Sequence, residues 1–197
     1  MSSFNDEYEA GTPPWDIGHP QPAFVALSHS GAVLGSVLDV GCGTGENALS
    51  FASLGHEVWG IDSAPLAIER ARRKAEERGL AAQFLVHDAL ALEGLGRTFA
   101  TVIDSGLFHV LTDEERLHYV ASLAQVLRPG SRYFMQCFSD KQPGDWGPRR
   151  VSQAEIRAAF AAGYRIDAIE EATFENSIEP SGSRAWFCSL TRLKTQV

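Results

Sequence analysis

The densest group of residues suited to chemistry is a glycine-rich turn. The segment Asp39-Val40-Gly41-Cys42-Gly43-Thr44-Gly45 follows a short apolar run and precedes a helical pattern. Glycines allow a tight backbone turn and let a ligand approach the main chain without a clash. A helix that begins there presents free N–H groups and the positive end of its dipole, which suit a carboxylate or a phosphate. The turn therefore predicts a site for a ligand with an anionic group.

Two classes of ligand compete for this turn. The dinucleotide fingerprint places its last glycine where this chain has Glu46, and an acid there is a poor neighbour for a pyrophosphate. The spacing of Gly41, Gly43 and Gly45 suits a ligand with an amino-acid end instead. Asp39 would attract the ammonium of that ligand, directly or through water, while the helix N–H groups would receive its carboxylate.

Two more acids stand where the next predicted strands end. Asp62 closes the second strand and can accept hydrogen bonds from both hydroxyls of a ribose. Asp88 follows the third strand and is placed to accept from an adenine amine. A single Asp at a strand end is more often a cap. Three acids at three successive strand ends favour a ligand that carries a nucleoside.

The fourth predicted strand leads into Asp104-Ser105-Gly106-Leu107-Phe108-His109. In doubly wound sheets, ligands bind beyond the carboxyl ends of the strands, near the point where the strand order reverses. Residues 105–109 should therefore line the reaction centre. His109 is the candidate base or orienting group, although a histidine with its hydrogen bonds satisfied at a helix start is an equal alternative. Phe108 is expected beside the substrate as a packing group.

A second candidate for substrate contact is the loop over residues 140–150. It places Trp146 among glycines and prolines and ends in Arg149-Arg150. We interpret it as a lid in which Trp146 stacks on a flat substrate and Arg149 faces the developing anion. The alternative is that both arginines are simply solvated.

The elements that must position these residues alternate between strand and helix. Strand patterns cover residues 36–40, 57–61, 82–86, 100–104, 132–138, 166–174 and 184–193. Helical patterns follow the first, second, fourth and fifth of these strands, which indicates a parallel sheet with helices on both faces. The last two strands have no helix between them and should form a hairpin. The predicted fold class is α/β, with a doubly wound, mostly parallel, seven-stranded sheet and an antiparallel edge strand.

Local signals define several boundaries. Ser63 is expected to cap the helix that starts at Pro65, and capping boxes are expected at Thr112 with Glu115 and at Ser152 with Glu155. The stripe expected to be buried in the helix after Thr112 consists of Leu117, Val120, Ala124 and Leu127. Residues 1–14 are polar and predict a mobile tail that is fixed only from Trp15 onward, and a short helix is expected around residues 23–27.

Together, these features resemble the class I S-adenosylmethionine-dependent methyltransferases. The resemblance covers about residues 12–193 and rests on residues 37–45, Asp62, Asp88 and Arg128-Pro129-Gly130. It implies a Rossmann-like fold, S-adenosylmethionine (SAM) as cofactor and S-adenosylhomocysteine (SAH) as product. The cofactor-binding residues expected from it are Trp15, Asp39, Gly41, Cys42, Gly43, Gly45, Asp62, Ser63, Asp88, Ala89 and Ser105.

A narrower resemblance lies upstream, in residues 12–22 (Thr-Pro-Pro-Trp-Asp-Ile-Gly-His-Pro-Gln-Pro). This segment is similar to the amino-terminal signature of the thiopurine and halide methyltransferase branch, and still closer to small actinobacterial heterocyclic toxin methyltransferases. It implies that residues 1–30 form a tail and lid over the cofactor, with Trp15 as a wall, and that residues 31–197 form the methyltransferase domain. His19 stands where we expect Arg in many relatives. The alternative is an inert proline-rich arm.

Composition excludes several other classes of protein. The chain has 197 residues, 44% of them hydrophobic, and a net charge of −8, so a core is possible and nucleic acid is an unlikely partner. No run of 18 apolar residues suggests a membrane span, and the acidic amino terminus does not resemble a signal peptide. Three cysteines, far apart, predict neither a disulfide framework nor a metal site. We expect a single-domain protein of the cytoplasm, monomeric or homodimeric.

The predicted function is methyl transfer to a small molecule. The expected acceptor is the hydroxyl oxygen of an aromatic, hydroxyquinolone-like heterocycle, with S- or N-methylation as variants. A halide or thiol methyltransferase is the principal alternative. A nucleotide-dependent oxidoreductase is disfavoured by Glu46, and a non-catalytic binding protein with the same fold is a third possibility.

Overall fold

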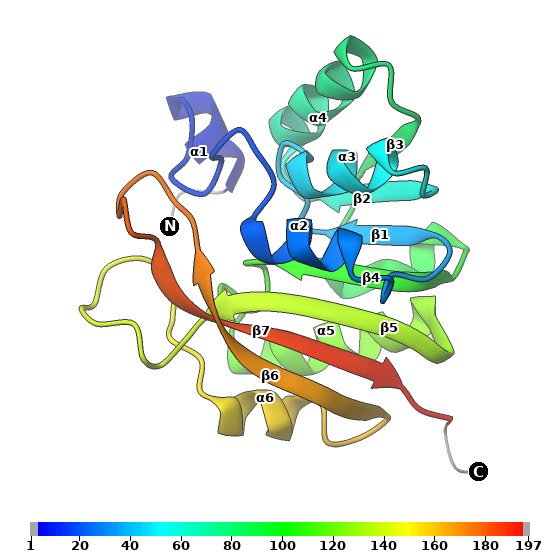
Figure 1. The fold of residues 1–197 in the computed structure, drawn as a ribbon, viewed down its shortest axis with the longest axis vertical. Coiled ribbons are helices and arrows are strands. Elements are labelled where there is room, and N and C mark those ends of the chain that lie inside the picture. The colour runs from blue at the N-terminus through cyan, green and yellow to red at the C-terminus, as the bar shows by residue number, and fades with distance from the viewer. Residues whose placement is uncertain (1–3, 195–197) are drawn as a thin grey trace.

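A single sheet organises the chain in the computed structural model, which describes residues 4–194. Its strands run in the order β3-β2-β1-β4-β5-β7-β6 (Figure 1). They are β1 (Val37–Val40), β2 (Val58–Asp62), β3 (Ala82–Val86), β4 (Phe99–Ser105), β5 (Leu127–Phe138), β6 (Tyr164–Phe174) and β7 (Ser183–Arg192). Strands β1 to β5 are parallel, and β7 runs antiparallel to both of its neighbours, β5 and β6. The predicted fold class is confirmed.

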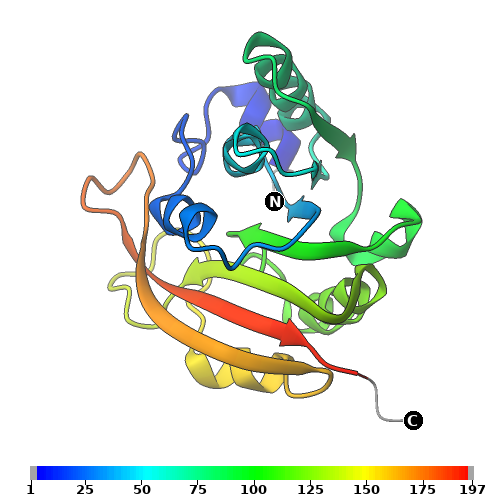
Figure 2. The same ribbon diagram turned by 45° about the vertical axis from the view of Figure 1, so that its right-hand side comes forward.

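Helices cover both faces of this sheet (Figures 1 and 2). On one face lie α2 (Pro22–His29), α3 (Glu46–Ser53) and α4 (Pro65–Glu77); on the other lie the 3₁₀ segment η1 (Ala89–Leu95), α5 (Asp113–Val126) and α6 (Gln153–Ala159). Each face has its own apolar core, and β1 contributes Leu38 and Val40 to one and Val37 to the other. This two-sided burial explains why β1 is a continuous apolar run apart from Asp39.

The parallel strands bring the chemistry-bearing residues to one edge. The register pairs Val40 with Ile61 of β2 and with Asp104 of β4. The residues that follow these positions, Gly41, Asp62 and Ser105, therefore leave the sheet side by side. The strand order reverses direction between β1 and β4, and this switch point is where ligands of doubly wound sheets bind.

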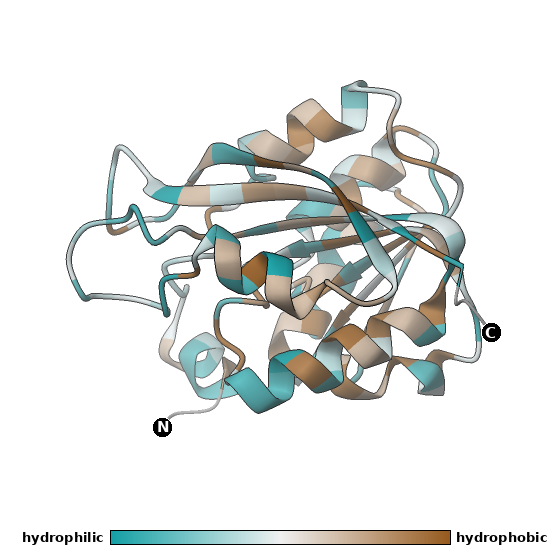
Figure 3. Ribbon diagram, turned by 90° about the horizontal axis from the view of Figure 1, so that it is seen from below, coloured by the Kyte–Doolittle hydropathy of each residue, from teal (hydrophilic) through white to brown (hydrophobic). Residues whose placement is uncertain are grey.

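The amino-terminal segment differs from the prediction. Residues Phe4–Ala10 form helix α1, and its Tyr8 is 2% exposed. Arg70 on α4 donates hydrogen bonds to the carbonyls of Tyr8 (2.7 Å) and Gly11 (3.0 Å). The expected mobile tail was therefore wrong for residues 4–14. A mainly hydrophilic helix with one buried side chain has no apolar periodicity for a sequence pattern to detect (Figure 3).

Capping signals are confirmed at two helices and wrong at a third. Both capping boxes form, at Thr112 with Glu115 and at Ser152 with Glu155. The N-cap of α4 is Ala64 rather than Ser63, and Asn5 of α1 accepts the first-turn N–H of Leu66 at 3.1 Å.

The buried face of α5 agrees with the predicted stripe only in part. Leu127 is buried and Val120 packs against the core, but Leu117 is 65% exposed. The buried side chains of the helix include Arg116, Tyr119, Leu123 and Val126. Arg116 is drawn inside because its Nε donates to the Phe108 carbonyl at 3.0 Å and its guanidinium lies over the Phe108 ring. A buried arginine is not visible to an apolar pattern. Within the described part of the chain, no helix has the length and apolar character needed to cross a membrane.

Candidate active site

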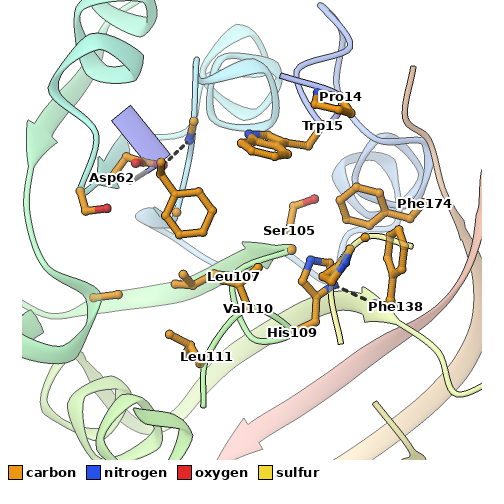
Figure 4. Close-up of a pocket in the computed structure, with 18 of the residues that line it drawn as sticks. Pro14, Trp15, Asp62, Ser105, Leu107, His109, Val110, Leu111, Phe138 and Phe174 are labelled. Carbon is orange, nitrogen blue, oxygen red and sulfur yellow. Dashed lines mark hydrogen bonds between the residues drawn. The ribbon is translucent and has the colours of Figure 1, made fainter. Parts of the chain in front are cut away.

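A cavity of about 600 Å³ opens at the carboxyl ends of β1, β2 and β4 (Figure 4). We call it the main chamber. A smaller hollow of about 60 Å³ adjoins it beside the glycine turn. Of the residues predicted for the site, the main chamber is lined by Trp15, Gly41, Gly43, Asp62, Ser63, Asp88, Ala89, Ser105, His109 and Trp146. Cys42 and Gly45 line the smaller hollow. Most of the predicted site residues therefore lie together.

The glycine turn is held in a shape that only glycine adopts readily. Gly41, Gly43 and Gly45 have φ angles of 71°, 52° and 86°. A Cβ at Gly43 would lie 2.8 Å from the Tyr8 hydroxyl, so the turn leaves no room for a side chain there. The Gly43 N–H donates to Asp62 at 2.9 Å, which joins the turn to the end of β2.

Asp62 and Asp88 keep accepting oxygens at the wall of the main chamber. The two oxygens of Asp62 accept the N–H groups of Gly43 and Ala64, and each retains a second lone pair. Burial raises the pKa of Asp62 above its usual value, although these N–H groups oppose that effect. Asp88 caps η1 through one oxygen, which accepts the Leu90 N–H at 2.8 Å, and its other oxygen is free for a ligand. Both positions suit the hydroxyl and amine donors of a nucleoside.

Asp39 lies behind the glycine turn. It is 1% exposed and is not part of the lining of either hollow. One oxygen accepts the Ala48 N–H at 3.2 Å, and the other is buried with no partner among the described residues. Burial and the nearby Asp104 raise the pKa of Asp39 to about 8. Of the two expected modes of contact, direct or through water, this position behind the turn favours the one through water, and the unpartnered oxygen would receive a polar group from the direction of the turn.

The smaller hollow contains a charged network that sequence reasoning missed. Lys74 on α4 donates to Thr44 at 2.7 Å and pairs with Glu46 at 2.8 Å, and Thr44 donates to Asp16 at 2.8 Å. Arg78 pairs with Glu46 as well. Burial raises the pKa of Glu46, but the hydrogen bonds from Arg78 and Lys74 outweigh it and lower the pKa overall. The charge of Glu46 is thus balanced, and by itself it does not exclude a pyrophosphate.

His109 has a defined protonation state. The ring is 5% exposed, and its Nδ1 accepts the backbone N–H of Phe138 at 2.9 Å. The ring proton is therefore on Nε2, which has no hydrogen-bond partner among residues 4–194. Burial, followed by the charges of Arg116 and Arg150, lowers the pKa of His109 to about 3.

This arrangement bears on the two roles expected for His109. A neutral ring with Nδ1 occupied and Nε2 protonated has no lone pair to offer a substrate. The geometry therefore favours a hydrogen-bond donor that orients a ligand over a general base. The sequence gives no sign of this protonation state, because the partner of Nδ1 is the backbone N–H of Phe138 at the end of β5.

Aromatic rings surround His109 on the substrate side of the main chamber (Figure 4). The rings of Phe138 and Phe174 have their centroids 5.1 Å and 5.8 Å from that of His109, and Trp146 packs edge-on against Phe138 at 5.9 Å. Sequence reasoning found Trp146 and missed both phenylalanines. Phe138 and Phe174 end β5 and β6, and the pairing of these strands with β7 brings the two rings together.

Two predicted substrate contacts are wrong. Phe108 is fully buried in the core against Phe160 and does not line the main chamber; its neighbour Leu107 does. Arg149 points away from the main chamber and pairs with Asp113 and Glu155, which ties the loop to α5 and α6.

Arg150, by contrast, holds the loop together from within. Its guanidinium donates to the carbonyls of Trp146 at 2.8 Å and Pro148 at 2.6 Å. This fixes the segment that carries Trp146 at the wall of the main chamber.

The amino-terminal segment closes the opposite wall. Trp15 lines both hollows and donates from its indole N–H to the Tyr8 hydroxyl at 3.0 Å. His19 lines the smaller hollow, with its Nε2 3.6 Å from Glu175. Tyr8 itself is a site residue that the sequence did not specify.

Comparison with known proteins identifies this architecture. A family model described as "Methyltransferase domain" matches residues 37–130, which include the glycine turn, Asp62 and Asp88. A 2-heptyl-1-hydroxyquinolin-4(1H)-one methyltransferase of Mycobacteroides abscessus is 40% identical over 84% of this chain and 74% of its own length. The chain is a class I SAM-dependent methyltransferase.

Solved structures agree with this assignment. One, determined in a study of the conversion of a disulfide bond into a thioacetal group during echinomycin biosynthesis, has a TM-score of 0.88 and 38% identity. It matches 98% of this methyltransferase and 93% of its own chain. The magnesium protoporphyrin IX methyltransferase of Synechocystis PCC 6803 with bound SAM, at 23% identity, shares the fold with a TM-score of 0.68, over 86% of this chain and 76% of its own.

The site of this methyltransferase fits its cofactor. The glycine turn leaves the main chain open, Asp62 and Asp88 have accepting oxygens that would suit the ribose and the adenine, and the unpartnered oxygen of Asp39 lies behind the turn. Trp15 and Ser105 border both hollows and so lie where the two parts of such a ligand would join. SAM supplies an electrophilic methyl group on sulfur. Among residues 4–194, no cluster of three His, Cys, Asp or Glu side chains is arranged to hold a metal ion.

Proposed function

We propose that this methyltransferase transfers the methyl group of SAM to a hydroxyl oxygen of a flat aromatic heterocycle of the hydroxyquinolone type. The observation that carries the proposal is the wall of the main chamber beyond β4, where the rings of Phe138, Phe174 and Trp146 lie around the hydrogen-bond donor of His109. A flat ring fits among such side chains, and its oxygen fits the donor. The substrate named for the Mycobacteroides relative has this chemistry.

The residues of the chain contribute mainly alignment and exclusion of water. Trp146 and Phe138 pack on the ring, and the donor on His109 fixes the position of the oxygen. Leu107, Val110 and Leu111 add apolar wall on the side of β4 and keep water from the reaction centre. Holding two reactants in line in a water-poor pocket accounts for much of the acceleration of a displacement reaction.

A sulfur acceptor is the second candidate. It is favoured by the likeness to the structure solved in the study of disulfide conversion, which covers nearly the whole chain. Sulfur is a weak hydrogen-bond acceptor. A sulfur acceptor would therefore gain less than an oxyanion from the donor on His109, which is why we favour oxygen.

We infer further that the protein acts in the cytoplasm on a small molecule, as a monomer or homodimer, without nucleic acid. The net charge of −8 supports this inference, since nucleic-acid binding depends on cationic surface.

The test uses SAM labelled with carbon-13 in its methyl group and three acceptors on one quinolone ring. One acceptor carries a hydroxyl, one a thiol and one hydrogen at the reactive position. We expect label on the oxygen of the hydroxy compound, with a higher kcat/KM than for the thiol and none for the hydrogen compound. A faster reaction with the thiol would favour the sulfur alternative, and no transfer to either would refute the proposed acceptor class.

A further inference from the structure

The main chamber is lined by few groups that exchange protons. Among residues 4–194, they are Tyr8, Asp62, His87, Asp88, His109 and Glu115. No Lys or Arg is among the described lining residues. A methyltransferase that deprotonates its acceptor needs one of these groups within hydrogen-bond reach of the acceptor oxygen, in its basic form.

His109 is the group nearest the expected acceptor, and it is already a donor. The backbone N–H of Phe138 occupies Nδ1 at 2.9 Å, so a switch to the tautomer with a free Nε2 lone pair would set two N–H groups against each other. The charged groups that face the ring are Arg116 from α5 and Arg150 from the loop before α6, and both disfavour a second proton on it. His109 therefore neither takes a proton from the acceptor nor stores one.

The other groups are engaged or distant. Asp62 ends β2, two strands away from β4, or roughly 10 Å at about 4.8 Å per strand. Glu115 accepts the N–H and hydroxyl of Thr112 in its capping box, which lowers the pKa of Glu115. Burial and the charge of Asp62 raise the pKa of Tyr8 far above its usual value, so its phenolate does not form near neutral pH. His87 and Asp88 follow β3, three strands away from β4, or roughly 14 Å at about 4.8 Å per strand.

We propose that the acceptor enters this site already ionised, because the group that faces its oxygen, the Nε2–H of His109, is a donor, and no group of the described lining is placed to act as its base. This inference rests on the proposed function and specifies its substrate. The proton is lost to water before binding. A lone pair of the anionic oxygen then forms the O–CH₃ bond, and the methyl–sulfur bond breaks with its electron pair left on sulfur. The negative charge of the oxygen and the positive charge of the sulfonium are neutralised together.

The same features select a kind of anion. Without a Lys or Arg in the described lining, a compact anion would lose its hydration and find no counter-charge from the protein. An anion whose charge is delocalised over a ring system loses less hydration free energy, and its ring also packs on Phe138, Phe174 and Trp146. The substrate class is therefore acidic hydroxyls on conjugated heterocycles, such as N-hydroxy or vinylogous acids, rather than simple phenols, which ionise near pH 10.

The pH dependence of the wild-type enzyme tests this inference. The experiment measures kcat/KM with SAM between about pH 5 and pH 10 for two hydroxyquinolones of equal shape, whose hydroxyl pKa values differ by about two units through a remote ring substituent. Each profile should reach a plateau above the acceptor's own pKa and fall about tenfold per pH unit below it. A midpoint shared by both acceptors would reveal a base on the enzyme and overturn the inference. No transfer to either acceptor would refute the proposed function itself.

A substitution separates the donor from a base. His109→Leu, which has no donor, should lower kcat/KM about 10- to 100-fold, the usual effect of losing a hydrogen bond to a charged group, without moving the midpoint of the profile. Disappearance of the fall in kcat/KM at low pH in this variant would identify His109 as the base. His118→Leu, at an exposed histidine on α5, is the matched control and should behave as the wild type does. If His109→Leu does not fold, the two wild-type profiles still decide the question.

Discussion

At the scale of single residues, hydrogen-bond partners determine which groups can react. Burial alone would leave His109 as an ordinary candidate for a catalytic base. The N–H of Phe138 removes that possibility, because it assigns the ring proton to the side that faces the main chamber. In the same way, the two N–H groups on Asp62 orient its carboxylate before any ligand arrives.

The role of Asp62 can be tested by truncation. Asp62→Ala should weaken SAH binding by about 1.5–3 kcal/mol, because the ligand loses hydrogen bonds to a charged acceptor. Isothermal titration calorimetry would measure this loss, and Glu69→Ala, at an exposed acid on α4, is the control. An unchanged affinity of Asp62→Ala for SAH would remove Asp62 from the binding site.

Asp39 should make the free protein sensitive to pH. Its pKa is about 8 in the folded protein against 3.8 for an unburied aspartate, so the folded state binds its proton more tightly. The resulting stabilisation is complete below the unfolded value and is lost as pH rises through 8. Relative to Asp39→Asn, which does not titrate, the Tm of the wild type without SAM should therefore fall between about pH 5 and pH 8.5. Parallel Tm curves for the two proteins would contradict this assignment.

At the scale of elements, side chains outside the sheet hold the walls of the site. Arg70 attaches α1 and the segment after it to α4, and Arg150 holds the loop that carries Trp146. Sequence patterns located most strands and helices, because these depend on local periodicity. They missed α1 and placed Arg149 at the substrate, where the structure pairs it with Asp113 and Glu155, because both outcomes depend on contacts between distant segments.

The attachment of α1 to α4 should affect cofactor binding. Arg70→Met removes the hydrogen bonds to Tyr8 and Gly11, so the amino-terminal wall loosens, and affinity for SAH should fall by about 1 kcal/mol. The Tm should change little, because α1 lies outside the two cores of the sheet. Arg73→Met, on an exposed position of the same helix, is the control. Equal affinities of the two variants for SAH would show that α1 does not close the site.

The loop that carries Trp146 should affect binding of the acceptor rather than binding of SAH. In Arg150→Gln, the carbonyls of Trp146 and Pro148 lose their shared donor, so the loop no longer holds the indole in place. We expect a higher KM for the aromatic acceptor and an unchanged Kd for SAH, with Arg157→Gln on the exposed side of α6 as control. A change confined to SAH binding would argue against a substrate lid.

At the scale of the whole molecule, parallel strand order gathers residues from distant parts of the chain at one edge. The glycine turn and the acids at the strand ends were predictable, because each is local and follows a recognisable strand. The ring cluster of Phe138 and Phe174 was not, because it arises from the register of β5, β6 and β7. The acceptor side of the site therefore depends on tertiary structure more than the cofactor side does.

The most direct test of the account is a crystal structure of the protein with SAH and a 2-alkyl-1-hydroxyquinolin-4-one. It should show the hydroxyl oxygen accepting a hydrogen bond from Nε2 of His109, the ring against Phe138 and Trp146, and the oxygen facing the sulfur of SAH. An acceptor bound with its oxygen away from His109, or outside the main chamber, would contradict the account.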